Sequence, residues 1–212
     1  MSSQLQFVLN GQAVSLLEVS PNTTLLEFLR GLGLTGAKEG CAEGDCGACS
    51  VVVVERDAEG RAIYRAVNSC LMPVCLMVGR EVISVEGVGC SAQMHPVQRA
   101  MAEGFGSQCG YCTPGFICSL FEGFYRDDLH THDDLDDQLS GNLCRCTGYR
   151  PIRDAALAAF TERQPCVRRL CPSRRIPLTW ALLTTKPPGK NSSAPRRWRN
   201  CMSCGKNSRM HD

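Results

Sequence analysis

The stretch KEGCAEGDCGAC (Lys38–Cys49) sets three cysteines within nine residues, and three glycines lie among its twelve residues. Loops this rich in cysteine build disulfide frames, zinc sites or iron–sulfur clusters. Glycine suits a loop that closes around a compact group, because it has no Cβ and adopts positive φ readily. The spacing of the other cysteines decides between these three kinds of site.

A fourth cysteine follows the stretch after 20 residues, which gives the pattern C-x4-C-x2-C…C of plant-type [2Fe–2S] ferredoxins. We expect Gly44 and Gly47 to let the backbone approach this cluster and direct N–H groups toward its sulfurs. Zinc is the alternative, but zinc sites usually combine one C-x2-C pair with a second close pair. The expected ligands of the first cluster are Cys41, Cys46, Cys49 and Cys70.

A second set of cysteines combines C-x2-C with C-x-C after a gap of 31 residues. Each pair comes just before a segment with a helical pattern, and helix N-termini favour anionic groups such as a thiolate-ligated cluster. Taken alone, this set also leaves zinc open. The expected ligands of the second cluster are Cys109, Cys112, Cys144 and Cys146.

The composition agrees with metal sites more than with disulfides. The 15 cysteines among 212 residues are an odd number, and the N-terminal MSSQLQFVLNG has neither the basic start nor the apolar run of a secretory signal. We therefore expect a reducing, cytoplasmic compartment. The longest nearly apolar run, 71–78, is too short to span a bilayer, so no membrane partner is expected. Cys75 and Cys118 lie in apolar helical patterns and are predicted to be core thiols.

Residues 1–88 alternate between strand and helix signals. Asn10-Gly11 predicts a tight hairpin, and Thr24 with Glu27 has the spacing of a capping box at a helix start. This order predicts an α+β chain whose first domain, 1–88, is a β-grasp ferredoxin-like domain. The expected elements are strands over 4–9 and 12–19, a helix from 24, strands over 50–55 and 62–68, a short helix within 68–78, and a last strand over 81–88.

Residues 94–161 have a helical pattern throughout and follow a linker near 87–93. Thr113 is the expected N-cap of the second helix, with Pro114 at the first helical position. The sequence therefore predicts a small four-helix domain that holds the second cluster. The expected helices begin near 95, 113, 132 and 150.

The last part of the chain, 162–212, is a basic, Pro/Arg-rich tail. Residues 163–212 carry 12 of the 23 Lys and Arg residues with one acid, which leaves 11 bases against 20 acids before them. Six of the 11 prolines also lie there, and we expect an irregular segment outside the packed body. The tail lacks the periodicity and aromatic interleaving of a nucleic-acid surface, so no nucleic-acid partner is expected.

Several segments together resemble the iron–sulfur part of the molybdenum hydroxylases, the xanthine dehydrogenase and aldehyde oxidase family. The resemblance covers roughly residues 4–160, and the sequence of these segments is most similar to the small subunit of bacterial xanthine dehydrogenases. It implies a β-grasp domain and a helical domain with one [2Fe–2S] cluster each. The segments are GAKEGCAEGDCGACSVVV, VNSCL, HPVQRAM, GSQCGYCTPGF and SGNLCRCTGYRPI.

The resemblance also implies a function. The chain would be the electron-transfer component of an oxidoreductase, relaying single electrons from a molybdenum cofactor on a large partner subunit toward FAD on another domain or subunit. Substrate chemistry, such as purine oxidation, would belong to the partner chain. Gln108, just before the second cysteine set, would hydrogen-bond the pterin of the molybdenum cofactor. The family's FAD domain has no counterpart after about 161, and we expect an out-of-frame or aberrant reading there.

Two other functions fit the residues. A stand-alone two-cluster electron carrier for a different reductase would use the same cysteines but would not purify with a molybdenum-containing chain. A zinc-stabilised interaction module would use them without redox chemistry, and the purified protein would be colourless.

Overall fold

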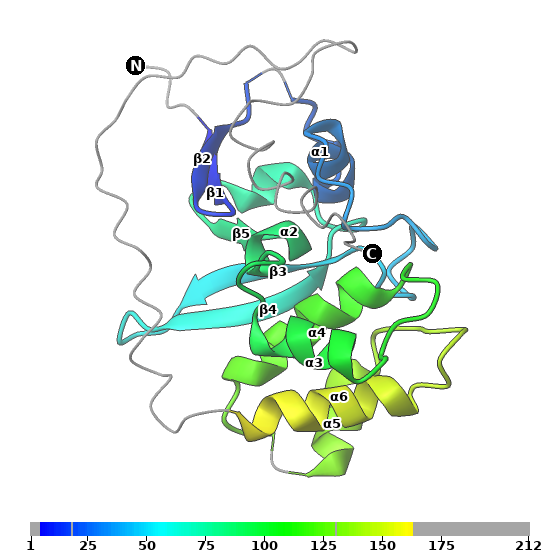
Figure 1. The fold of residues 1–212 in the computed structure, drawn as a ribbon. Helices are drawn as coiled ribbons and strands as arrows, with labels where there is room; N and C mark the ends of the chain where they lie inside the picture. Colours follow the sequence, from blue (N-terminus) through cyan, green and yellow to red (C-terminus); the bar gives the residue numbers. More distant parts are fainter. Residues whose placement is uncertain (1–4, 18, 130, 163–212) are drawn as a thin grey trace.

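A computed structural model of the chain describes residues 5–17, 19–129 and 131–162. The predicted tail, 162–212, lies outside these residues except for Glu162. The described chain has a β-sheet half and a helical half, which meet along one face of the sheet (Figure 1). The predicted α+β class is confirmed, and the helical half contains the four expected helices.

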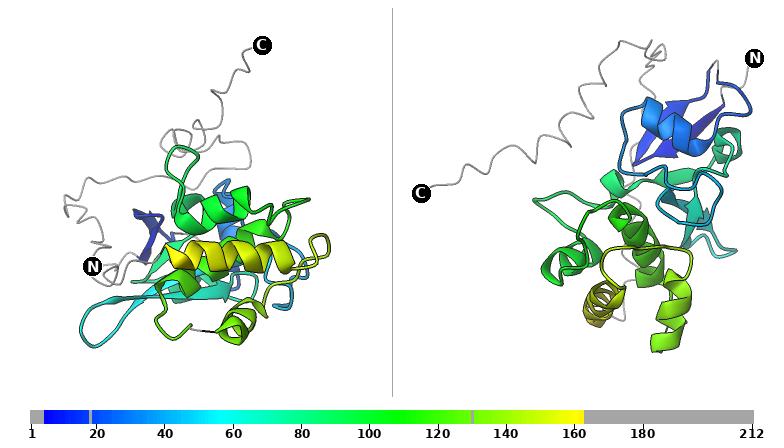
Figure 2. Two further views of the ribbon diagram at one scale, coloured as in Figure 1. Left: turned by 60° about the horizontal axis from the view of Figure 1, so that its bottom comes forward. Right: turned by 90° about the vertical axis from the view of Figure 1, so that its right-hand side faces the viewer.

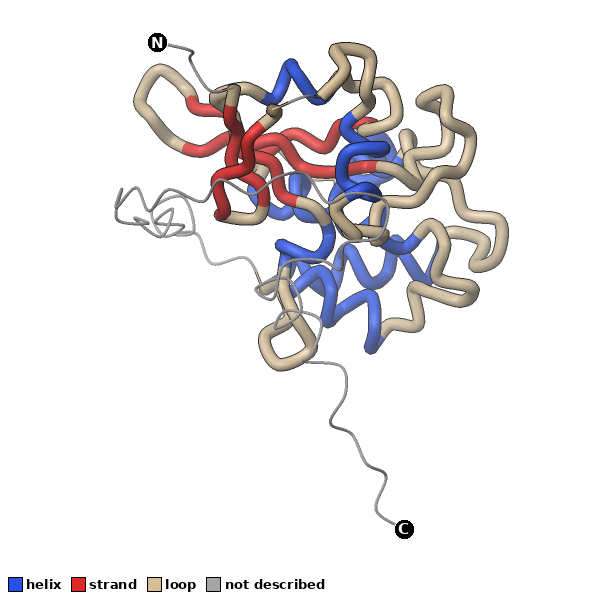
Figure 3. The backbone as a smooth tube through the Cα atoms, turned by 90° about the horizontal axis from the view of Figure 1, so that it is seen from above, coloured by secondary structure: helices blue, strands red, loops and turns tan. Residues whose placement is uncertain are grey.

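The sheet has five strands in the order β2-β1-β5-β3-β4, and Figure 3 shows these strands gathered together beside the helices. β1 pairs with β5 in parallel, and the other neighbours are antiparallel. The central strand β3 is apolar along most of its length, as a strand covered on both faces must be. The strands are β1 (Gln6–Leu9), β2 (Gln12–Ser15), β3 (Ser50–Arg56), β4 (Ala62–Asn68) and β5 (Glu81–Ile83).

The start of the chain folds as its turn and cap residues predict. Asn10 and Gly11 have φ of 49° and 75°, which is the conformation that a two-residue hairpin turn requires. Helix α1 (Leu25–Gly31) begins with the predicted capping box: the Glu27 amide donates to Thr24 Oγ1 at 3.1 Å, and the Thr24 amide donates to Glu27 Oε2 at 2.8 Å. These bonds satisfy two amides that the helix leaves unpaired.

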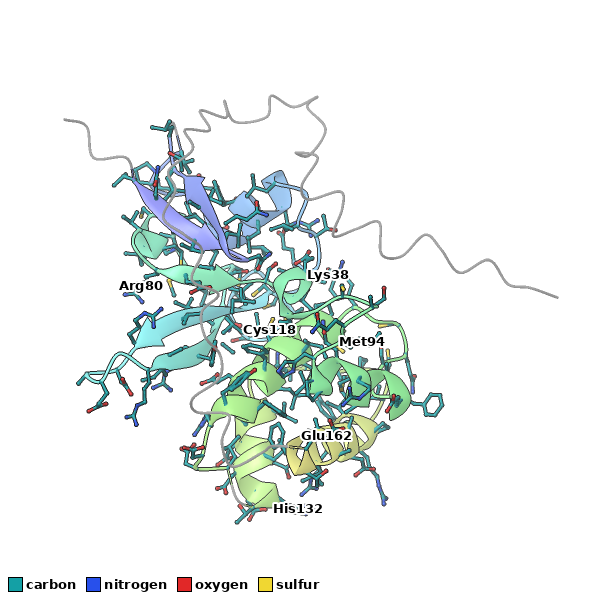
Figure 4. All side chains as sticks on the ribbon, turned by 60° about the vertical axis from the view of Figure 1, so that its left-hand side comes forward. Lys38, Arg80, Met94, Cys118, His132 and Glu162 are labelled. Carbon is teal, nitrogen blue, oxygen red and sulfur yellow. The ribbon has the colours of Figure 1, made fainter. Side chains whose placement is uncertain are left out.

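The two faces of the sheet have different coverings. Val51 and Val53 of β3 face the core beneath α1, whereas Val52 faces Cys118 and Phe121 of helix α4 (Thr113–Tyr125). Figure 4 shows Cys118 where the strands meet the helices. Cys118 is fully buried, as predicted.

Helix α4 is the centre of the helical half, and its residues 115–124 are all buried. It has no exposed stripe because the sheet covers one side and other helices cover the rest. Figure 2 shows α6 lying alongside α3. The helices of this half are α3 (Pro96–Glu103), α4 (Thr113–Tyr125), α5 (His132–Leu139) and α6 (Arg150–Thr161).

Several predicted boundaries are wrong for local reasons. Strand β5 ends at Ile83, because the next amide, Ser84 N–H, donates to the Asn10 side chain at 2.8 Å, and a short helix α2 (Val85–Val88) follows. Thr113 is not the N-cap of α4: its hydroxyl donates to Ser107 Oγ, and the cap position falls to Cys112.

Two further differences concern strand and helix lengths. β2 ends at Ser15, four residues short of the predicted end. The expected helix within 68–78 is only a 3₁₀ turn, η1 (Val74–Met77), which follows Pro73. The turn places Cys75 at the surface, so its prediction as a core thiol is wrong. Among the described residues, no helix is long and apolar enough to cross a membrane.

Candidate iron–sulfur sites

The first cysteine set lies on the loop between α1 and β3 and at the end of β4. Pairing of Ser50 with Asn68 brings the start of β3 beside the end of β4, which places Cys49 next to Cys70. Their sulfurs are 3.3 Å apart, and both residues are buried. Cys41 and Cys46 form a second, partly buried pair, in which the Cys46 amide donates to Cys41 Sγ at 3.4 Å. The set therefore has an inner and an outer pair of thiols.

The two glycines singled out in this loop have different surroundings. Gly44 has φ of 90°, and its amide lies near enough to the Cys70 sulfur to oppose the rise in pKa that burial causes there. Gly47 has φ of 65°, and a Cβ there would collide with the carbonyl oxygen of Gly141 and the side chain of Asn142. Gly44 thus directs an amide toward a sulfur. The missing Cβ of Gly47 instead allows the loop around Asn142 to pack directly against the first cysteine loop.

The second cysteine set lies on two loops, one before α4 and one before α6. Cys112 and Cys144 are close neighbours, and so are Cys109 and Cys146. Each short motif therefore gives one sulfur to each pair. Cys144 is buried and Cys112 partly buried, whereas Cys109 and Cys146 are exposed. The second set repeats the arrangement of the first, with one inner pair and one outer pair.

The thiols within a site differ in acidity. Hydrogen bonds from the amides of Glu43 and Cys46 lower the pKa of Cys41 to about 7. Burial, with the nearby Cys49, raises the pKa of Cys70 to about 11. Burial also raises the pKa of Cys112 to about 12, and Cys144 adds to the effect. Neighbouring thiolates repel each other, and a cationic metal centre removes this repulsion.

The donor sets suit a two-iron cluster. In a [2Fe–2S] cluster four cysteines ligate two irons, two for each. Each site here has four thiols in two pairs. The chemistry and pairing of the sulfurs therefore fit [2Fe–2S] clusters at both sites.

The loops of the two sites contact each other directly. The Leu143 amide, next to Cys144, donates to the Cys46 carbonyl oxygen at 3.0 Å. The buried Asn142 side chain donates to the Gly47 carbonyl oxygen at 3.1 Å. The Tyr111 hydroxyl donates to the Glu39 carbonyl oxygen at 2.5 Å. The two sites are thus neighbours joined by backbone and side-chain hydrogen bonds. The sequence analysis did not identify Asn142 and Leu143 as site residues, and the only signal for them in the sequence is their position next to Cys144.

The outer side of the second site lies at the surface. Gln108 is exposed beside Cys109, and Phe105 of the same loop is 82% exposed. This surface carries the residue that the resemblance assigned to the molybdenum cofactor.

Two known families match the chain. Residues 7–75 match the family described as a 2Fe-2S iron-sulfur cluster binding domain, and residues 84–157 match the [2Fe-2S] binding domain family. The fold and its two cysteine sites therefore define a protein with two [2Fe–2S] domains.

The relatives define the family more closely. Xanthine dehydrogenase of Emericella nidulans is 48% identical over 163 residues, covering 76% of this chain and 12% of the relative. Aldehyde oxidase 2 of Macaca fascicularis is 43% identical over 172 residues, covering 79% of this chain and 13% of the relative. The chain is thus similar to xanthine dehydrogenases and aldehyde oxidases over a segment that makes up about an eighth of their length.

Solved structures share the fold. The aldehyde oxidoreductase of Desulfovibrio gigas aligns with a TM-score of 0.67 at 35% identity, over 77% of this chain and 18% of that one. Quinoline 2-oxidoreductase from Pseudomonas putida 86 aligns with a TM-score of 0.63 at 29% identity, over 76% of this chain and 98% of the matched chain. The chain thus spans a small part of the long relatives and nearly all of one short chain.

Proposed function

We propose that this chain is the iron–sulfur electron-transfer part of a molybdenum hydroxylase of the xanthine dehydrogenase type. The observation that carries the proposal is the direct contact between two four-cysteine sites, each divided into two thiol pairs. In this proposal Cys41, Cys46, Cys49 and Cys70 hold the first [2Fe–2S] cluster, and Cys109, Cys112, Cys144 and Cys146 hold the second.

A bound [2Fe–2S] cluster accepts and donates one electron at a time. The protein's own contribution is to hold the ligands in place and shield them from water. The buried pair Cys49–Cys70 anchors the first site to the sheet, and the Gly44 amide stabilises negative charge on the Cys70 sulfur. The Cys46–Leu143 hydrogen bond keeps the two loops close enough for electron transfer between them.

The partners follow from the family and from the exposed surface. The relatives are much longer than this chain, so we assign the molybdenum cofactor and FAD to other chains or domains. The surface with Gln108 and Phe105 fits a contact with the molybdenum-bearing partner, and Gln108 is the proposed donor or acceptor for the pterin. The cysteine content supports a reducing, cytoplasmic compartment for the assembly.

Metal analysis and co-purification of the full chain test this proposal. We expect about four irons and four acid-labile sulfides per chain, from two [2Fe–2S] clusters, with visible absorption and a bound molybdenum-containing chain. Two zinc ions in a colourless protein would support the interaction module instead. Clusters without any molybdenum-containing partner would support a stand-alone carrier.

A variant separates the partner contact from cluster assembly. Gln108→Ala should leave the iron content unchanged, because Gln108 lies at the surface beside the cysteines, and should slow reduction of the clusters by substrate. Ser91→Ala, on the exposed segment after α2, is the control, and it should change neither measurement. Normal reduction of the Gln108→Ala clusters would contradict the pterin contact.

A further inference from the structure

The sulfur of Cys144 has a hydroxyl neighbour. Thr147 Oγ1 lies 3.1 Å from Cys144 Sγ, and the Thr147 amide donates to the same sulfur at 3.5 Å. In the first site, the Cys41 sulfur accepts from the Cys46 amide, and the Cys70 sulfur has the Cys49 thiol as its side-chain neighbour at 3.3 Å. Cys144 differs from both in having a hydroxyl as a side-chain neighbour.

The direction of the Thr147 hydroxyl bond is fixed by its surroundings. The Tyr149 amide donates to Thr147 Oγ1 at 3.2 Å, so that oxygen already accepts one hydrogen bond. A cysteine that ligates iron is a thiolate and has no proton to give. When Cys144 is a thiolate ligand, the Thr147 hydroxyl is therefore the donor to Cys144 Sγ.

A closed set of hydrogen bonds holds this geometry. The Cys144 amide donates to the Tyr149 hydroxyl at 3.0 Å, which links the cysteine back to the residue that orients Thr147. Tyr149 has φ of 67°, a conformation that costs a residue with a side chain of order 1 kcal/mol or more. The backbone of Tyr149 stays in this conformation because both its amide and its hydroxyl are engaged.

The Thr147 hydroxyl and amide both approach the Cys144 sulfur, so two hydrogen-bond dipoles lie against it. A donor that stabilises negative charge on a ligand sulfur favours the reduced form of a cluster, which carries one more electron.

We propose that Thr147 is a positioning residue of the second site, whose hydroxyl donates a hydrogen bond to the ligand sulfur of Cys144 and raises the reduction potential of that site. The inference rests on the proposed function, because it takes Cys144 as a cluster ligand. Its consequence is that the second site holds an electron more readily than it does without the hydroxyl.

Redox titration of the full chain, followed by electron paramagnetic resonance of each cluster, tests this inference. Thr147→Val removes the hydroxyl and keeps the shape, and it should lower the second-site potential while the first-site potential stays constant. Thr147→Ser keeps a hydroxyl and should restore the second-site potential. Thr113→Val is the matched control, because Thr113 adjoins Cys112 but its hydroxyl donates to Ser107 Oγ at 2.8 Å.

A second measurement distinguishes loss of the Thr147 hydrogen bond from a change in assembly of the second cluster. After exchange into deuterated water, the wild type and Thr147→Ser should show one more exchangeable hydrogen coupled to the second cluster than Thr147→Val or Thr147→Ala. An unshifted potential in both Thr147→Val and Thr147→Ala, or an equal fall in Thr113→Val, overturns the inference. A wild-type chain that binds no iron overturns the proposed function as well, so the two failures are distinguishable.

Discussion

Replacing Asn142 with alanine should loosen the contact between the two cysteine loops. The Asn142 side chain is buried, accepts from Ser119 Oγ at 2.5 Å and donates to the Gly47 carbonyl oxygen at 3.1 Å. The Gly47 oxygen also accepts from the amide and hydroxyl of Ser50, so it is not left without a partner in the variant. Two hydrogen bonds are lost, each with a net contribution of about 1 kcal/mol.

The loss of about 2 kcal/mol applies to local opening of the segment around Asn142, because Asn142 joins this segment to helix α4 through Ser119 and to the first loop through Gly47. Opening exposes the Leu143 amide, which donates to the Cys46 carbonyl oxygen in the closed form. Since about 1.4 kcal/mol is a factor of ten, the Leu143 amide should exchange with solvent about 30-fold faster in Asn142→Ala. Magnetic interaction between the two reduced clusters should weaken at the same time.

Hydrogen exchange of the intact chain, measured by mass spectrometry on a peptide containing Leu143, is the assay. Asn10→Gly is the control, because Asn10 also joins distant segments through two hydrogen bonds to Ser84. Glycine accepts the positive φ at that turn, so Asn10→Gly should speed exchange at Ser84 and leave Leu143 unchanged. Unchanged Leu143 exchange in Asn142→Ala would refute the role given to Asn142.

Three more predictions follow from other parts of the structure. Burial lowers the pKa of His95 to about 4, so the unfolded chain binds a proton before the folded chain does as the pH falls. The free energy of unfolding should therefore drop by about 2 kcal/mol between pH 7 and 5. His95→Asn should remove this drop in unfolding experiments. Cys70→Ser should lower the iron and sulfide content, whereas Cys75→Ser, at an exposed cysteine outside both sites, should leave it unchanged in metal analysis. Gly115→Ala should separate α4 from the first loop, because its Cβ would collide with the Gly47 carbonyl oxygen, and cluster-to-cluster magnetic interaction should fall.

The local parts of the fold were predictable from the sequence because short-range chemistry determines them. The Asn10-Gly11 turn and the Thr24–Glu27 capping box each depend on residues that are close in the chain. The end of β5 was not predictable in this way, because the Ser84 amide is taken by Asn10, a residue 74 positions away. Burial of α4 on all sides likewise depends on the sheet and helices that cover it, which no helical period reveals.

The cysteine spacing predicted two sets of four thiols, but it carried no information on how the thiols pair. In the second set, Cys112 lies beside Cys144 and Cys109 lies beside Cys146. This pairing arises because the two loops run in opposite directions where they lie side by side. The role of Gly47 was also beyond the sequence. Its missing Cβ makes room for Gly141 and Asn142, so the glycine serves contact between the sites.

One short segment, Asn142 to Thr147, carries most of what distinguishes the second site. Asn142 and Leu143 attach it to the first loop, Cys144 and Cys146 supply two thiols, and Thr147 supplies the hydroxyl donor. Because these functions lie within six consecutive residues, a shift of the segment changes the spacing between the sites and the hydrogen bond to sulfur together. Asn142→Ala should therefore also alter the second-site potential, whereas Thr147→Val should alter the potential without changing Leu143 exchange. This asymmetry separates a residue that holds the loops together from one that acts on a single sulfur.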